Sequence, residues 1–222
     1  MSTGNNLTNI IPLKPLAETI TGFEHIRRYW DKDRVKYAAK ILPGEYYVTL
    51  ENELIVTTLG SCIAACIRDP AAGVGGMNHF MLPYRISGIS KKYDPRISFA
   101  NRYGNYAMEN LINDILKNGG RKQNLEIKVF GGGKVLTNMT DVGQKNIEFI
   151  ENYVQTEGLK LLAKDLGDVF PRKVVYDPIT GNVRVKKLRT LHNNTIAQRE
   201  DRYLKDIDDK TLSGKIELFK QD

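Results

Sequence analysis

The stretch TTLGSCIAACIRDPAAGVGGMNHFMLP, residues 57 to 83, decides how this 222-residue chain is organised. Gly60 and Ser61 indicate a tight turn before Cys62, and the apolar run after the cysteine indicates a buried strand. A second apolar segment closes the stretch. The turn-forming sequence DPAAG between the two segments favours antiparallel pairing. Such a pair of strands would bring His79 beside Cys62.

A thiol beside an imidazole is the minimum apparatus for nucleophilic acyl chemistry, because the thiolate attacks and histidine accepts its proton near neutral pH. Either cysteine could instead be a small buried hydrophobe, and we expect this for Cys66, which lies deeper in the apolar run. A zinc site built from Cys62, Cys66 and His79 would need a fourth ligand or an open position. The C-x-x-x-C spacing with one distant histidine is weak for zinc, so no metal is expected.

A catalytic histidine needs a partner that orients its other ring nitrogen. No acid lies near His79 in the sequence, but Thr57 and Thr58 precede the cysteine, and a threonine hydroxyl can accept this hydrogen bond. On a strand, Thr58 has the same parity as Cys62. We therefore predict Thr58 as the partner, with Thr57 as the alternative.

The composition, 41% hydrophobic and 27% charged, is that of an ordinary globular protein. We expect a catalytic domain over residues 41–190, an N-terminal leader arm over 1–40 and a polar C-terminal arm over 191–222. No apolar run approaches the roughly 18 residues of a membrane span, and the polar start does not resemble a signal peptide. These features predict a cytoplasmic protein with free thiols.

The net charge of +7 is largely local, because residues 171 to 189 contain one acid, Asp177, and six cations: Arg172, Lys173, Arg184, Lys186, Lys187 and Arg189. A solvated face is the plainer interpretation, and a docking face for an acidic protein is the alternative. No nucleic-acid motif accompanies the charge, so nucleic acid is not expected as a partner.

The remaining pattern predicts an α+β fold with mostly antiparallel sheets and flanking helices, because it contains at least six strands but only two clear core helices. Helices are expected at 102–118 and 141–156, the second capped by Asp141, with a short amphipathic segment around Phe23, Ile26 and Tyr29. Strands are expected at 45–50 and 53–59 as a hairpin, at 62–68, 74–82 and 125–130, with a strand and loop over 159–168 and a hairpin over 172–188. The segment KIELF near the end is expected to be a last strand or an apolar anchor. The run GGGK at 131–134 lacks phosphate-loop spacing and indicates a bend where the backbone passes close to another segment.

Six segments together resemble the CheD family, the chemoreceptor glutamine deamidases of bacterial and archaeal chemotaxis. They lie between about Gly22 and Leu188: TTLGSCIAACIRDP, GVGGMNHFMLP, YGNYAMENLINDILKNGG, KVFGGG, VGQKNIEFIENYV and DPITGNVRVKKL. The resemblance implies Cys62 as the nucleophile, His79 as its base and a preceding threonine as the third catalytic residue. In some relatives that threonine lies six residues before the cysteine, where this chain has Val56.

The resemblance also implies an α/β sandwich akin to bacterial deamidating toxins, and hydrolysis of selected glutamine amides on the cytoplasmic helices of methyl-accepting chemoreceptors. The reaction would pass through a thioester, with backbone N–H groups of the Gly60 to Cys62 turn stabilising the oxyanion. It needs no cofactor and would allow weak glutamyl methylesterase activity. A CheC-type phosphatase is a further partner in some organisms. The alternatives are a non-catalytic adaptor for receptor or CheC-like helices and a nucleic-acid module that uses the basic hairpin.

Overall fold

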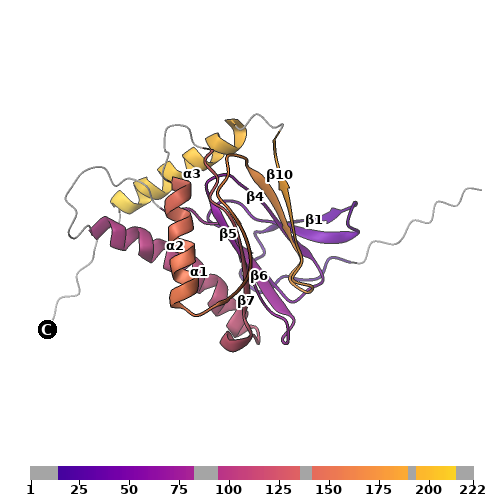
Figure 1. Cartoon of the computed structure of the whole chain (residues 1–222). Helices are drawn as coiled ribbons and strands as arrows, with labels where there is room; N and C mark the ends of the chain where they lie inside the picture. Colours follow the sequence, from indigo (N-terminus) through magenta and orange to yellow (C-terminus); the bar gives the residue numbers. More distant parts are fainter. Residues whose placement is uncertain (1–14, 83–94, 136–141, 190–193, 214–222) are drawn as a thin grey trace, which may run out of the picture.

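The computed structural model describes residues 15–82, 95–135, 142–189 and 194–213. Its strands form two five-stranded sheets (Figure 1). Sheet A has the order β1 (Arg27–Asp31), β2 (Lys36–Lys40), β4 (Leu54–Leu59), β9 (Arg172–Tyr176), β10 (Val183–Lys187). Sheet B has the order β3 (Tyr46–Thr49), β6 (Val74–Asn78), β5 (Ile63–Asp69), β7 (Glu126–Gly131), β8 (Lys160–Leu166).

The predicted α+β class with mostly antiparallel pairing is confirmed. Only the pairs β2/β4 and β7/β8 are parallel among the described strands. Helices α1 (Pro95–Lys117) and α2 (Val142–Thr156) pack on sheet B, as the two predicted core helices. The third helix, α3 (Asn194–Ser213), runs across one end of the molecule above the strands (Figure 1). No described helix is both long and apolar enough to cross a membrane.

The main core lies between the two sheets and under α1 and α2. Alternate residues of each strand enter it, such as Ile55 and Thr57 of β4 and Val174 of β9, and these are almost fully buried. The opposite face of sheet A carries a smaller apolar cluster formed by Ala38, Leu54, Val56 and Val175, with Tyr29 packed against it. Sheet A therefore has one face in the core and one outer face.

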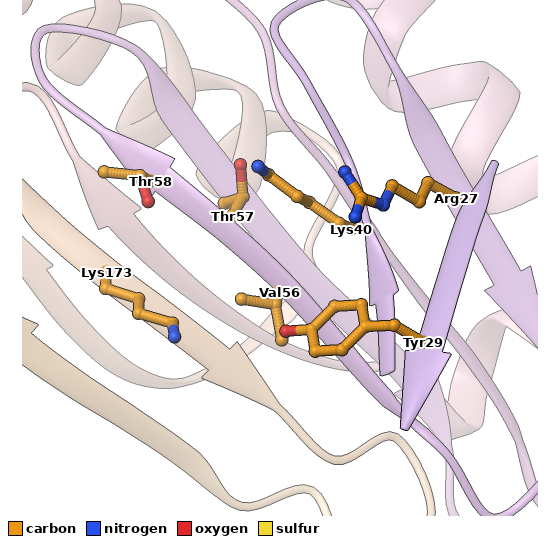
Figure 2. Close-up of a pocket in the computed structure, with 7 residues that line it drawn as sticks. All are labelled: Arg27, Tyr29, Lys40, Val56, Thr57, Thr58 and Lys173. Carbon is orange, nitrogen blue, oxygen red and sulfur yellow. The ribbon is translucent and has the colours of Figure 1, made fainter. Parts of the chain in front are cut away.

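The outer face of sheet A also carries a pocket of about 300 Å³ (Figure 2). Three cationic side chains lie around it, and its lining is Arg27, Tyr29, Lys40, Val56, Thr57, Thr58 and Lys173. Arg27 and Lys40 are register partners on β1 and β2, and Lys173 is opposite Thr58 on β9 and β4. The pairing of the strands thus gathers these cations on one face.

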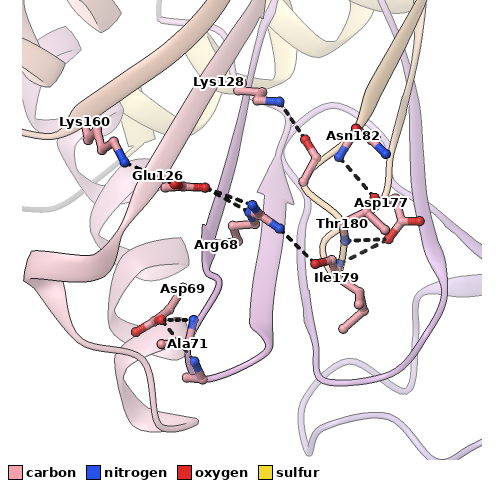
Figure 3. A network of polar contacts seen from close by, with 12 residues as sticks. Arg68, Asp69, Ala71, Glu126, Lys128, Lys160, Asp177, Ile179, Thr180 and Asn182 are labelled. Carbon is pink, nitrogen blue, oxygen red and sulfur yellow. Dashed lines mark hydrogen bonds and ion pairs between the residues drawn. The ribbon is translucent and has the colours of Figure 1, made fainter.

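The β9–β10 hairpin is predicted correctly, and its turn is tied to sheet B (Figure 3). Arg68 of β5 donates to the Ile179 carbonyl at 2.8 Å and also pairs with Glu126. Lys128 of β7 donates to the Gly181 carbonyl at 2.7 Å. These bonds join the two sheets at the end of the sandwich that carries the hairpin turn.

Two local predictions are wrong. The three-residue spacing of Phe23 and Ile26 belongs to a turn, in which the Ile26 N–H donates to the Phe23 carbonyl, and Tyr29 then lies in strand β1. The strands at 45–50 and 53–59 form no hairpin, because β3 pairs in sheet B and β4 in sheet A. Glu53, between the two strands, accepts hydrogen bonds from the Tyr47 and Thr49 hydroxyls.

The cap at Asp141 and the strand KIELF lie outside the described residues. The division of the chain at residues 40 and 190 stays a prediction. Strands β1 and β2, before the first boundary, pair into the same sheet as β4, and α3, after the second, packs on the site described next.

Candidate active site

The structure brings Cys62 and His79 together, as the antiparallel pairing of their segments predicts. Cys62 lies in the turn between β4 and β5, and His79 follows β6. A β-bridge pairs Ile63 with Phe80, and both of its N–H···O distances are 2.9 Å. This bridge holds the preceding residues, Cys62 and His79, side by side. The cysteine sulfur and a ring nitrogen of His79 lie within 4.8 Å of each other, and both side chains are buried.

Two further elements hold the turn that carries the cysteine. The N–H of Gly132 donates to the Cys62 carbonyl at 2.8 Å, and that of Gly133 donates to the Gly60 carbonyl at 2.7 Å. A Cβ atom at Gly131 would overlap the Cys62 carbonyl, and the residue has φ +120°. The predicted close passage of the glycine run is therefore confirmed, and the partner segment is the turn that carries Cys62.

Asn146 of α2 is a further buried residue that positions the site. Its side-chain nitrogen donates to the Ser61 carbonyl at 2.8 Å, and its oxygen accepts from the Leu82 N–H at 2.9 Å. One amide side chain thus connects the turn before Cys62 with the segment after His79.

Thr57, not Thr58, contacts the histidine. Its hydroxyl lies 2.7 Å from Nδ1 of His79 and donates to the Ile41 carbonyl at 2.9 Å. Because the single hydroxyl hydrogen is given to Ile41, the hydroxyl oxygen accepts from an Nδ1–H. This arrangement assigns the tautomer in which the other nitrogen, Nε2, carries a free lone pair.

Nε2 is buried and has no hydrogen-bond partner among the described residues. Burial lowers the pKa of His79 to about 3, and the charge of Arg199 contributes to the shift. The imidazole is therefore neutral near pH 7. A neutral imidazole with its unprotonated nitrogen beside a thiol can accept the thiol proton.

The prediction that Thr58 orients His79 is wrong. Its side chain belongs to the outer face of sheet A, where it lines the pocket with Lys173 (Figure 2). The parity argument fails because β4 ends at Leu59 and the chain turns at Gly60 and Ser61 into a strand of the other sheet. Parity with Cys62 does not continue through such a turn.

A residue that sequence reasoning missed, Glu200 of α3, completes the site. Its carboxylate accepts hydrogen bonds at 2.7 Å from the N–H groups of Gly60 and Ser61 and from the Ser61 hydroxyl. A fourth bond comes from the Cys62 N–H at 3.3 Å. The backbone donors predicted for an oxyanion are therefore present, and a carboxylate occupies them.

Glu200 also changes the electrostatics of the thiol. Burial, followed by the nearby Glu200 charge, raises the pKa of Cys62 well above its ordinary value. Burial raises the pKa of Cys66 as well, and this cysteine is a core residue on β5, as predicted. Both cysteines are protonated thiols in the described conformation.

Cys62, His79 and Glu200 are also the residues of this site that could hold a metal ion, since one ligand atom of each lies within 4.8 Å of the others. Four donors already approach the carboxylate, however, and a carboxylate offers about four lone-pair positions. The hydrogen-bonding pattern therefore fits an anion in a cradle of donors better than a metal ligand.

The basic hairpin is less uniform than its sequence suggests. Arg172 is fully buried and binds the carbonyls of Asp165 and Gly167. Lys187 pairs with Asp168, and Arg189 lies over the Phe170 ring. The other three cations, Lys173, Arg184 and Lys186, lie on the outer face of sheet A next to the cationic pocket.

Comparisons with known proteins agree in the family that they indicate. A family model described as CheD chemotactic sensory transduction matches residues 81–187. A protein of Halorhodospira halophila named "Probable chemoreceptor glutamine deamidase CheD" is 55% identical, over 92% of this chain and 94% of the relative. Proteins with the same name from Hahella chejuensis and Hydrogenovibrio crunogenus are 47% and 53% identical, over 93% and 81% of this chain and 96% and 93% of the relatives.

A solved Neisseria meningitidis protein of family DUF152 matches 56% of this chain and 53% of its own, with 9% identity and a TM-score of 0.35. A similarity of this level carries no argument about fold or function.

Proposed function

This chain belongs to the CheD family, and from that premise we propose that it is a chemoreceptor glutamine deamidase that converts selected glutamine side chains of chemoreceptors to glutamate. The observation that carries the proposal is the pairing of Cys62 with a histidine whose tautomer is fixed. The Thr57 hydroxyl lies 2.7 Å from Nδ1, the buried Nε2 has no hydrogen-bond partner among the described residues, and a ring nitrogen lies within 4.8 Å of the Cys62 sulfur.

In the reaction, Nε2 of His79 accepts the thiol proton and the Cys62 sulfur attacks the glutamine carbonyl carbon. The carbonyl oxygen becomes negative and binds in the cradle of N–H groups of Gly60, Ser61 and Cys62. His79 returns the proton to the nitrogen as the C–N bond breaks, so that ammonia leaves and a thioester remains. Water then attacks the thioester with His79 as the base, which releases glutamate and restores the thiol.

The same steps accept a glutamyl methyl ester, because only the leaving group differs, and weak methylesterase activity is part of the proposal. The reaction draws on this chain's own side chains and main chain, without a cofactor. We place the protein in the cytoplasm, where receptor signalling helices lie. A CheC-type phosphatase as partner stays a prediction.

The outer face of sheet A is our candidate for a charged contact that steers the receptor, in addition to the contact that its modified helix makes at Cys62. An acidic helical bundle would meet Lys173, Arg184 and Lys186 there, together with the cationic pocket lined by Arg27 and Lys40. Charges of this kind mainly steer the encounter and orient the partner. Lys187, Arg172 and Arg189 are excluded from this role by their own contacts.

Mass spectrometry of a receptor cytoplasmic fragment tests the proposal directly. Each converted glutamine gains about one dalton, because OH replaces NH₂. We expect Cys62→Ala to abolish the gain and Cys66→Ala to preserve it, since the second thiol lies in the core. A fragment that binds the protein but never gains mass would instead identify a non-catalytic adaptor. Retained deamidation in Cys62→Ala would contradict the choice of nucleophile.

A further inference from the structure

The described conformation is closed to a protein substrate. Cys62 is 0% and His79 1% exposed, so no glutamine side chain of a receptor can reach the sulfur. Glu200 of α3 covers the turn that carries the nucleophile, with its carboxylate on the N–H groups of Gly60 and Ser61. The closed state thus has a defined cause within this chain, the position of one helix.

The group that closes the site has the chemistry of the product. Deamidation of a receptor glutamine leaves a glutamate side chain on a helix, and Glu200 is a glutamate on a helix. Its carboxylate lies in the donors that would bind the oxygen of the reacting amide, within 4.8 Å of the sulfur and of a ring nitrogen. A carboxylate at this position blocks access, fills the oxyanion cradle and repels a thiolate.

The seat of α3 is shaped to receive a helix. Leu204, one turn beyond Glu200, is buried in the main core cluster, and the Tyr203 hydroxyl lies 2.6 Å from that of Tyr103 on α1. Two glycines form the floor, because a Cβ at Gly44 would come within 2.7 Å of the Tyr203 oxygen and one at Gly60 within 2.6 Å of Glu200 Oε2. Close approach of helix side chains to the backbone is therefore built into this groove.

We propose that α3 is an intramolecular product analogue, which occupies the groove where the receptor helix docks and places Glu200 where the modified side chain of the receptor lies. This inference rests on the proposed function for the identity of the competing helix. The enzyme works when α3 leaves and a receptor helix takes its place. A tethered competitor acts at a high effective concentration, so receptor helices must bind well enough to displace it.

The buried residues of α3 lie on one face of the helix, and this face packs on the site. Among residues 195–207 of the helix, the buried positions are Ile196, Glu200, Leu204 and Ile207, four or three residues apart, so an acid stands in the middle of an apolar stripe. An acid at a buried position is costly unless donors surround it. Four donors do so here, and all of them belong to the nucleophile turn.

The first test measures access to Cys62 with iodoacetamide, in a Cys66→Ala background so that a single thiol reacts. Glu200→Ala should raise the alkylation rate by about tenfold or more, because the thiol becomes exposed and loses a neighbouring negative charge. Asp206→Ala, which removes an exposed acid from the same helix, should leave the rate unchanged. Equal rates in Glu200→Ala and wild type would overturn the inference.

The second test asks whether Glu200 occupies the substrate position. Glu200→Gln places an amide in the cradle, so Cys62 should attack it, release one ammonia, and hydrolyse the thioester with one water. The variant should therefore revert to glutamate at position 200, with a gain of about one dalton in the peptide that contains it. A double variant with Cys62→Ala should stay an amide. An amide that persists beside an active Cys62 would show that α3 does not imitate the product.

A second variant, which weakens the packing of α3 away from Glu200, keeps the test valid if Glu200→Ala does not fold. Leu204→Ala keeps the carboxylate but weakens the packing of the helix, and it should raise both alkylation and receptor deamidation while circular dichroism confirms the fold. Faster alkylation with no receptor deamidation in any variant would refute the proposed function and leave the closure by α3 standing. Receptor deamidation that is equally fast in wild type, Glu200→Ala and Leu204→Ala would refute the closure and leave the function standing.

Discussion

Replacing Thr57 by valine removes one hydroxyl and almost no volume, and it tests the assigned tautomer of His79. The hydroxyl accepts from Nδ1 at 2.7 Å and donates to the Ile41 carbonyl at 2.9 Å, and all three groups are buried. The substitution therefore leaves a buried donor and a buried acceptor without this partner. The histidine also loses the contact that keeps its proton on Nδ1.

The size of both effects follows from the number of bonds lost. An unsatisfied buried polar group costs about 1 to 3 kcal/mol, so the two groups left by Thr57→Val should lower the free energy of unfolding by about 2 to 6 kcal/mol. The bond from Nδ1–H to the Thr57 hydroxyl stabilises the reactive tautomer. If its loss costs about 1 to 3 kcal/mol in the transition state, deamidation should slow by about 5- to 150-fold. Thr57→Ser keeps the hydroxyl and should stay near the wild-type rate.

The assay is the rate of mass gain in a receptor fragment, measured at a temperature where urea titration shows each variant to be folded. Thr58→Val is the matched control, because it makes the same change one residue along β4 on the outer face. We expect no loss of activity from it. A slow Thr58→Val enzyme beside a fast Thr57→Val enzyme would refute the assignment of the tautomer and restore the parity argument.

Two further predictions concern pH and charge. Burial holds the pKa of His79 at about 3, whereas the ordinary value is 6.5, so the unfolded chain binds a proton between these pH values that the folded chain does not. The stability that a neutral His79 allows is therefore complete above pH 6.5 and decreases as the pH falls toward 3. Relative to His79→Gln, wild type should lose roughly 3 kcal/mol of unfolding free energy between pH 6.5 and 4 in urea titrations, and a constant difference would contradict the buried neutral state. Reversing to glutamate the outer-face cations Lys173, Arg184 and Lys186 should slow receptor deamidation at low salt, with a gap that closes as salt rises; an equal effect from reversing Lys122, Lys160 and Lys164 would show net charge alone to be responsible.

The juxtaposition of Cys62 and His79 could be predicted from the sequence because its geometry is local. Two apolar segments joined by a turn pair in antiparallel fashion, and that pairing alone places Cys62 beside His79. The glycine run at 131–134 likewise predicts a close approach to another backbone segment, and the structure shows this segment to be the turn that carries Cys62. What failed were arguments that needed the chain to stay in one sheet, since β3 and β4 lie in different layers and the turn after Leu59 breaks strand parity.

Glu200 could not be found in the same way. It lies 138 residues from Cys62 in the sequence, in a helix rich in charged residues, where one more acid is unremarkable by composition. The sequence offers one indication of Glu200, because this acid lies at helical spacing between the apolar residues Ile196, Leu204 and Ile207. That pattern indicates a buried carboxylate, but the donors that receive it come from a distant turn and appear only in the folded chain.

The main-chain bonds of Gly132 and Gly133 to the nucleophile turn have a consequence for how the enzyme can be tuned. The turn that carries Cys62 is bound by main-chain groups that follow strand β7, whereas α3 is held by side chains such as Glu200 and Tyr203. If α3 leaves the site as proposed, substitutions in α3 change the fraction of time that the site is open. The main-chain bonds of Gly132 and Gly133 keep the Cys62 turn in place.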